Sequence, residues 1–255
     1  MAEVSKAILD DLKKRLVDGL QILSAEGTLG AMGHISVRVP GTELFLINPR
    51  YAPNVAGVDD ICLVTMDGKR VDGPGPIPGE TPIHSGILKR RPDVDAVVHC
   101  HPRSAVIMSC IDHPVVPYSI VANTFRKGVP VYPEAHQVDT PERGDALAVS
   151  LGDHLAVLQR GHGIAAVGPS IEGVCLVSIR LDHTCADQIE IMKYATPEPV
   201  NDPESPDPWN GLKNPYREWP YLLQKHGVRP VDEIKAGIRP PKEGSRSRDA
   251  GKSES

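Results

Sequence analysis

Two histidines separated by one residue, His99 and His101, follow a short apolar run at residues 96–98. Alternate residues of a β-strand point to the same face of a sheet, so the two imidazoles can converge on one metal ion. A His-x-His pair alone fits a metal site and a pair of surface or hydrogen-bonded histidines equally well. His162 offers the third nitrogen that would decide, because the glycines on both sides of it allow close approach. Three neutral imidazoles with an open fourth position are typical of a catalytic metal site.

Glu80 is the first candidate for proton transfer. It opens the helix predicted at residues 80–90, which leads into the strand that carries His99. One interpretation is a simple helix-start acid, since the helix dipole favours a carboxylate in the first turn. The other is a general acid or base beside a metal, or an additional ligand while no substrate is bound. His84 follows four residues later on the same helical face, and we expect a structural role for it.

Arg50 is the candidate for recognising a negatively charged substrate. It ends the turn Asn48-Pro49-Arg50 between two predicted strands. A guanidinium group suits bidentate binding of a carboxylate, which favours a substrate of that kind. The alternative is a solvated arginine in a surface turn.

These residues need a framework of strands and helices to bring them together. Apolar residues at steps of three and four predict a first helix at residues 4–25. Short apolar runs separated by turn residues predict strands, and the Pro- and Gly-rich residues 71–79 predict a loop. The result is a mixed α/β order, with strands at 35–39, 44–47, 61–66, 96–99, 129–132 and 155–167 and further helices at 80–90, 102–110, 141–151 and 171–194.

Composition sets the limits of this framework. The chain has 255 residues, is 40% hydrophobic and carries a formal net charge of -5, which predicts one large domain, and a shift in composition at residue 196 places the expected catalytic body at residues 1–195. From residue 196 the proline content rises, so we expect residues 196–238 to pack on the body or on a neighbouring subunit. Residues 239–255 are polar enough to predict a disordered tail.

The same composition argues against several classes of protein. No concentration of basic residues indicates a nucleic-acid partner, and no apolar run approaches the roughly 20 residues of a membrane span. Residues 1–19 are too charged for a signal peptide, so we expect a cytoplasmic protein without a membrane partner. The five cysteines include no Cys-x-x-Cys pair, which argues against a disulfide framework.

Glu80, the run RPDVDAVVHCHP that begins 11 residues later, and the run QRGHG around His162 together resemble the class II aldolase/adducin family. GHISVR at residues 33–38 is similar to the glycine turn before that family's substrate loop. The resemblance covers residues 8–194. It implies a three-layer α/β/α fold with a mostly antiparallel central sheet, and a homotetramer with sites at subunit boundaries. It also implies one divalent metal ion per subunit (zinc, manganese, cobalt or iron) on His99, His101 and His162, with Glu80 as acid or base.

Departures from the family pattern bear on the substrate. Sugar-phosphate members usually show Gly-Asn-x-Ser in the first loop and Ser-Ser before the catalytic Glu, whereas this chain has His34 and Pro78-Gly79 there. The missing hydroxyl and amide groups argue against a phosphate. The GHIS variant and the loop arginine resemble a branch that decarboxylates hydroxylated aromatic dicarboxylates, such as dihydroxyphthalate. We therefore expect a metal-dependent carboxy-lyase acting on a small carboxylate, with His34, Ser36 and Arg50 as substrate contacts.

Other functions remain open at this point. An aldolase, epimerase or dehydratase of a sugar acid or sugar phosphate would use the same metal ligands. An adducin-like interaction module is disfavoured, because such members lack the metal-binding histidines. In the C-terminal segment, Trp209, Tyr216, Trp219 and Tyr221 can close over a planar substrate or pack at an interface. We expect packing, and we keep Tyr216 and Tyr221 as further substrate-binding candidates.

Overall fold

A computed structural model describes residues 5–200, 202, 204 and 206–238 of the chain. Contacts divide the chain into two compact units, Met1–Pro215 and Tyr216–Ser255. The predicted disordered tail at residues 239–255 lies outside the described residues. Among the described helices, none is long and apolar enough to cross a membrane.

The first unit is built on an eight-stranded sheet with the order β4-β3-β2-β1-β5-β8-β7-β6. All the neighbouring strands described run antiparallel except β6 and β7, which are parallel. The sheet is therefore mixed and mostly antiparallel. Its strands are β1 (His34–Arg38), β2 (Leu44–Ile47), β3 (Cys62–Thr65), β4 (Arg70–Asp72), β5 (Ala96–Cys100), β6 (Val131–Tyr132), β7 (Ala156–Gln159) and β8 (Gly163–Gly168).

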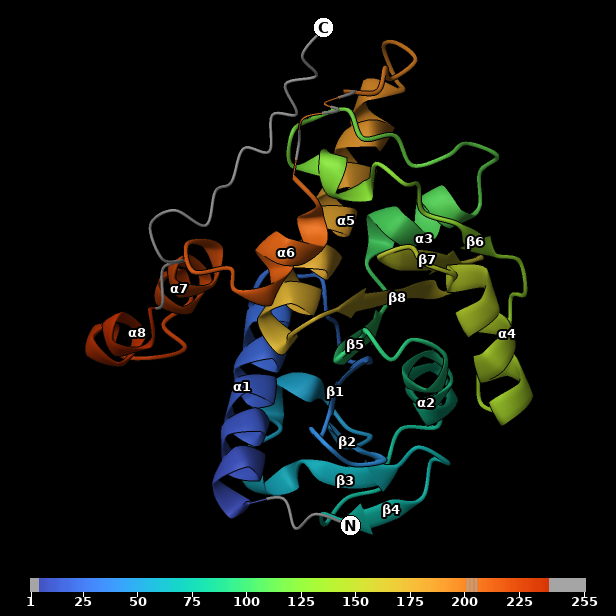
Figure 1. Cartoon of the computed structure of the whole chain (residues 1–255). Helices are drawn as coiled ribbons and strands as arrows, with labels where there is room; N and C mark the ends of the chain where they lie inside the picture. Colours follow the sequence, from blue (N-terminus) through green and yellow to red (C-terminus); the bar gives the residue numbers. More distant parts are fainter. Residues whose placement is uncertain (1–4, 201, 203, 205, 239–255) are drawn as a thin grey trace, which may run out of the picture. The chain divides into compact units, whose positions relative to one another are not determined.

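Helices cover both faces of this sheet (Figure 1). One face carries α1 (Lys6–Ala25), α3 (Arg103–Ser109) and α5 (Ile171–Ile191), and α6 (Pro208–Lys213) packs against α5. The opposite face carries α2 (Thr81–Arg90) and α4 (Pro141–Leu151). Three short 3-10 helices, η1 (Pro53–Val55), η2 (Val58–Asp60) and η3 (Ala122–Phe125), lie in the connections. The helices and the sheet thus form three layers.

Local sequence explains how the helices begin and pack. The side chain of Ser170 accepts a hydrogen bond of 2.9 Å from the backbone N–H of Gly173 and caps α5. On the other face, α2 and α4 approach so closely that a Cβ on Gly144 would lie 2.2 Å from the carbonyl oxygen of Pro82. Only glycine fits there. This close pair of helices fixes the start of α2, where Glu80 is the N-cap residue.

Two sequence predictions need correction. Residues 155–167 are not one extended run, because Gly161 adopts a φ of 63° and turns the chain between β7 and β8. His162 therefore lies in a turn and not in a strand. Residues 71–79 are not wholly a loop, since Val71 and Asp72 belong to β4, which pairs with β3 at the sheet edge.

The described part of the second unit, residues 216–238, contains two short helices, α7 (Glu218–Lys225) and α8 (Val231–Gly237), which pack against each other. The buried apolar residues within this part are Trp219, Leu222, Leu223 and Ile234.

Candidate metal centre

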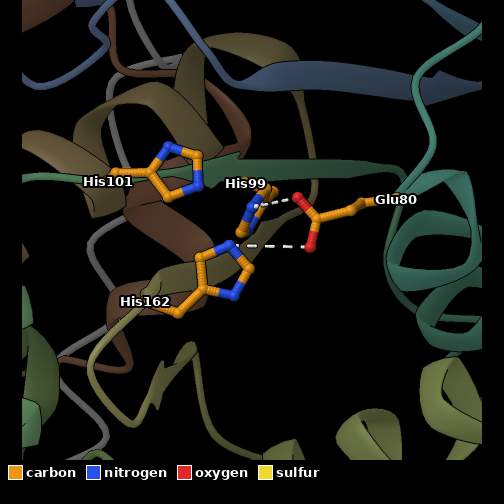
Figure 2. A group of neighbouring side chains, drawn as sticks. All are labelled: Glu80, His99, His101 and His162. Atoms are coloured by element: carbon orange, nitrogen blue, oxygen red, sulfur yellow. Dashed lines mark ion pairs between the residues drawn. The ribbon is translucent and has the colours of Figure 1, made fainter. Parts of the chain in front are cut away.

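Four side chains from separate parts of the first unit converge at one point (Figure 2). Glu80 comes from the start of α2, His99 from β5, His101 from just after β5, and His162 from the turn between β7 and β8. One potential ligand atom from each lies within 4.8 Å of the others. The structure thus brings together the metal ligands and the proton-transfer residue expected from the sequence.

His99 is the most constrained member of the cluster. Its side chain is fully buried, and its Nδ1 lies 2.9 Å from the carbonyl oxygen of Ile164 on β8. A carbonyl oxygen only accepts, so Nδ1 carries a hydrogen, and in the neutral form of the ring Nε2 presents a lone pair. Nε2 lies 3.2 Å from Oε2 of Glu80 but has no hydrogen-bond partner among the described residues. A buried lone pair facing a carboxylate in this way calls for a cation between them.

Glu80 is held on its other oxygen. The backbone N–H of Val138 donates to Oε1 at 3.1 Å, and Nε2 of His162 lies 3.6 Å from the same atom. Burial raises the pKa of this carboxyl, but contact with the His99 ring and the positive charge that His99 and His162 carry when protonated outweigh it and lower the pKa to about 2. Glu80 is therefore a carboxylate at neutral pH.

Glycine geometry presents His162 to the cluster. Gly161 N–H donates to the buried Ser109 side chain at 2.9 Å, which anchors the turn on α3. On the other side, a Cβ on Gly163 would lie 2.4 Å from the carbonyl oxygen of Cys100, so β8 passes β5 more closely than a side chain allows. The close approach expected here is confirmed for Gly163, whereas Gly161 is required for its positive φ of 63°.

The pKa values of the two less buried imidazoles are lowered, which keeps these rings neutral at neutral pH. Burial, followed by the neighbouring histidines, lowers the pKa of His101 to about 4. Burial and His99 likewise lower the pKa of His162. Neutral imidazole is the form that binds a metal. Three such nitrogens and a carboxylate suit zinc, manganese, cobalt or iron, so the residues present fit a divalent metal ion.

A cleft of about 690 Å³ opens beside the cluster. Its lining includes Glu80, His101 and His162 together with His34 and Arg50. Arg50 is exposed, and no ion-pair partner for its guanidinium occurs within residues 5–200, 202, 204 and 206–238. Its backbone N–H donates to the carbonyl oxygen of Pro76 at 2.8 Å, which fixes the loop. The cleft therefore places an available guanidinium in the same space as the candidate metal ligands.

His34 enters the site through the pairing of β1 with β5, where it lies opposite His99. The two rings stack with their centroids 5.4 Å apart, and the His84 ring lies 5.6 Å from His34. Burial lowers the pKa of His34 well below its ordinary value, so the ring is neutral. Its Nδ1 is buried and has no hydrogen-bond partner among the described residues.

Ser36 was expected to contact the substrate, but the structure does not place it in the cleft. The side chain is fully buried, does not line the cleft, and lies 2.7 Å from Nδ1 of His84. His84 is itself fully buried, which agrees with the structural role expected for it. The alternation of β1 places Ser36 on the same face as His34, but α2 covers it there. The geometry assigns Ser36 to the support of the site.

The C-terminal tyrosines belong to the second unit. Tyr216 is partly buried, with the guanidinium carbon of Arg217 5.5 Å from its ring centroid. Tyr221 lies on α7 and is 59% exposed. Their role as substrate contacts stays a prediction.

Tyr51 and His136 also line the cleft, and sequence reasoning missed both. Tyr51 directly follows Arg50, and this adjacency is the one signal that could have drawn notice to it. His136 lies in the loop after β6 and belongs to no spacing motif. Its backbone contacts the His162 side chain, so folding of the chain and not local pattern places it here.

Comparison with known proteins places these features in context. The family model described as "Class II Aldolase and Adducin N-terminal domain" matches residues 16–189. A 3,4-dihydroxyphthalate decarboxylase of Arthrobacter keyseri is 33% identical over 177 residues, covering 64% of this chain and 71% of the relative. A protein of the same name from Rhodococcus jostii is 31% identical over 186 residues, covering 66% and 75%.

A solved structure supports the same fold. The L-fuculose 1-phosphate aldolase of Glaciozyma antarctica aligns with a TM-score of 0.74 and 24% sequence identity. The alignment covers 89% of this chain and 94% of that chain. At this identity the likeness concerns the fold alone.

Proposed function

The chain belongs to the class II aldolase and adducin family, and we propose that it is a metal-dependent carboxy-lyase of hydroxylated aromatic acids. A dihydroxyphthalate is the model substrate. The relatives described above that share about 30% identity are named 3,4-dihydroxyphthalate decarboxylases, which favours a carboxy-lyase over an aldehyde-lyase. The observation that carries the proposal is the position of Arg50 in the same cleft as Glu80 and the histidine cluster.

His99, His101 and His162 would hold the metal, and Glu80 lies close enough to be a fourth ligand before substrate enters. A divalent ion there would act as a Lewis acid that stabilises negative charge on a substrate oxygen. The buried, unpartnered Nε2 of His99 supports this assignment, because no other described group neutralises its contact with the carboxylate.

Arg50 binds and orients the substrate carboxylate in this proposal. Its guanidinium offers two parallel N–H donors, which match the two oxygens of a carboxylate. The backbone hydrogen bond to Pro76 holds the loop in place, so the Arg50 side chain extends into the cleft from a fixed backbone position. His34 donates a second hydrogen bond to the carboxylate or to the second hydroxyl.

Glu80 moves the proton. Its low pKa makes it a base at first, so it takes the proton from the substrate hydroxyl that lies next to the departing carboxylate. The protonated Glu80 then donates to the ring carbon that bears this carboxylate. The carbon–carbon bond breaks, its electron pair returns to the ring, and carbon dioxide leaves. A proton from water restores the hydroxyl, so one proton is taken up for each carbon dioxide released.

A substrate panel tests the proposal. Carbon dioxide release is measured from hydroxyphthalates and hydroxybenzoates with purified protein, after chelation, and after return of zinc, manganese, cobalt or iron. We expect release from an ortho-hydroxylated carboxylate, lost on chelation and regained with one of the metals. L-fuculose 1-phosphate is the matched alternative, and its cleavage without decarboxylation of any aromatic acid would sink the proposal.

The proposed assembly rests on the family resemblance alone. We propose a homotetramer acting on a small carboxylate in the cytoplasm. Light scattering of the full chain measures its mass in solution, and a monomer would contradict the tetramer.

A further inference from the structure

The ring of Tyr51 is a part of the cleft that the proposed chemistry does not use. Tyr51 follows Arg50 in the loop after β2 and lines the same cleft as Glu80 and His162. It is 39% exposed, and among the described residues of the lining it carries the one phenol, phenyl or indole ring. In a chain with only 4% aromatic residues, such a ring beside the candidate catalytic groups calls for a role.

The hydroxyl of Tyr51 is already occupied. It hydrogen-bonds to the carboxylate of Asp60, whose Oδ2 also accepts the backbone N–H of Gly57 at 2.7 Å. Partial burial and this carboxylate raise the pKa of Tyr51 to about 12, so the phenol stays protonated and keeps donating. With the hydroxyl bound to Asp60, the group that Tyr51 offers to the cleft is its ring.

The loop behind Tyr51 keeps the ring in place. A Cβ added to Gly75 would lie 2.8 Å from Cβ of Pro49 and 3.7 Å from Cε1 of Tyr51, so the two loops touch at this point. The backbone N–H of Tyr51 also donates to the carbonyl oxygen of Pro49 at 3.0 Å. The ring is therefore supported at its hydroxyl, along one edge and at its backbone.

A fixed ring next to an available guanidinium suits a ligand that is both flat and acidic. A carboxylate can bind Arg50 while the attached aromatic ring stacks on Tyr51, and an acid without a π system gains only the first interaction. We propose that Tyr51 determines specificity, as the platform on which the cleft selects planar aromatic carboxylates over non-planar acids of the same charge. This inference rests on the proposed function and names the substrate feature that the cleft recognises, a planar aromatic ring.

Two ligands of equal charge distinguish the contribution of the aromatic ring to binding from the contribution of the carboxylates. Phthalate and cis-cyclohexane-1,2-dicarboxylate both carry adjacent carboxylates, but only phthalate is aromatic. Their dissociation constants are measured by calorimetry on metal-loaded full-length protein and on the variants Tyr51→Phe and Tyr51→Leu. Tyr194→Leu is the control, because Tyr194 is 87% exposed and does not line the cleft.

We expect Tyr51→Leu to bind phthalate about 10-fold more weakly, the upper range for a lost aromatic pair, with cyclohexane dicarboxylate changed less than about 2-fold. Tyr51→Phe keeps the ring and is expected to stay within about 3-fold of the parent for phthalate. If Tyr51→Leu does not fold, Tyr51→Met replaces it, since methionine also keeps apolar volume without a π face.

Equal weakening of both ligands in Tyr51→Leu, or no weakening of either, would overturn the platform. A loss in Tyr51→Phe as large as in Tyr51→Leu would do the same, because it would transfer the effect to the hydroxyl. Binding and turnover are measured separately, so the two proposals fail separately. Selective loss of phthalate binding in Tyr51→Leu, without decarboxylation of any aromatic acid by the parent protein, would support the stacking role of Tyr51 and contradict the carboxy-lyase proposal.

Discussion

Nε2 of His99 lies 3.2 Å from Oε2 of Glu80 in a buried site (Figure 2), and in the neutral form of His99 both atoms present lone pairs. The hydrogen of the His99 ring is on Nδ1, where it is donated to the carbonyl oxygen of Ile164. Two acceptors so close together repel each other unless a proton or a metal ion lies between them. This contact is the physical basis for a metal centre at this place.

Replacing His99 is expected to remove the metal. His99→Asn lacks Nε2, the buried ring nitrogen that faces Glu80. Metal content should therefore fall from one ion per chain to a small fraction. Elemental analysis of dialysed protein measures this. His183→Asn is the control, because His183 is exposed on α5 and outside the cluster. Full metal content in His99→Asn would contradict the assignment.

Replacing Glu80 should separate proton transfer from metal binding. Glu80→Gln keeps the shape of the side chain but cannot carry the proton, so kcat should fall about 100- to 10,000-fold. Three imidazoles remain, and we expect the metal to stay bound. Steady-state kinetics and metal analysis check the two expectations, with exposed Glu190→Gln as the matched change elsewhere. Undiminished kcat in Glu80→Gln would show that another group moves the proton.

Replacing Arg50 should affect substrate binding more than turnover. Loss of hydrogen bonds to a charged group costs about 1.5–3 kcal/mol, which corresponds to a rise in KM of roughly 10- to 150-fold for Arg50→Ala. The KM of Arg50→Lys should lie between those of the parent protein and Arg50→Ala, because lysine keeps the charge but not the bidentate geometry. Initial rates over a range of substrate concentration measure both. An unchanged KM would mean that Arg50 is a solvated loop residue.

Fully buried His84 predicts a pH dependence of stability. Burial lowers its pKa from 6.5 to about 3, so the unfolded chain binds a proton that the folded chain does not. The contribution of His84 to stability is present above about pH 6.5 and is lost as the pH falls toward 3. Urea unfolding of chelated protein at several pH values measures it. We expect His84→Gln to reduce the slope between pH 6.5 and 4 by up to about 1.4 kcal/mol per unit, while exposed His183→Gln leaves it unchanged.

An equal slope in the parent protein and His84→Gln would contradict this account. It would place the proton uptake on other groups, such as His34 and His101, whose pKa values burial also lowers.

Strand alternation sufficed to predict that His99 and His101 share one face, because it is a local property, whereas the association of Glu80 with them was implied by the resemblance to the family. The sequence also identified His162, but not the turn that carries it. Apolar residues 155–158 and 164–167 flank the run QRGHG, and periodicity does not register the left-handed backbone of Gly161 within it. The chemistry of the site was therefore more predictable than the geometry of one of its ligands.

Contacts between distant segments account for the rest. Alternation gave the face of β1 on which Ser36 lies, but only the packing of α2 shows that His84 covers it. Tyr51 and His136 reach the cleft from loops whose paths depend on tertiary contacts, the first through Gly75 and Pro49 and the second beside His162. No local pattern encodes such contacts.

The most direct test of the carboxy-lyase follows carbon dioxide and the ring proton in one experiment. Metal-loaded protein is incubated in heavy water with a dihydroxyphthalate labelled with carbon-13 in its carboxylates, and the products are analysed by mass spectrometry. The account predicts one labelled carbon dioxide and one deuterium on the ring carbon per product, both lost on chelation and both strongly slowed in Glu80→Gln. Intact substrate under these conditions, with L-fuculose 1-phosphate cleaved instead, would contradict it.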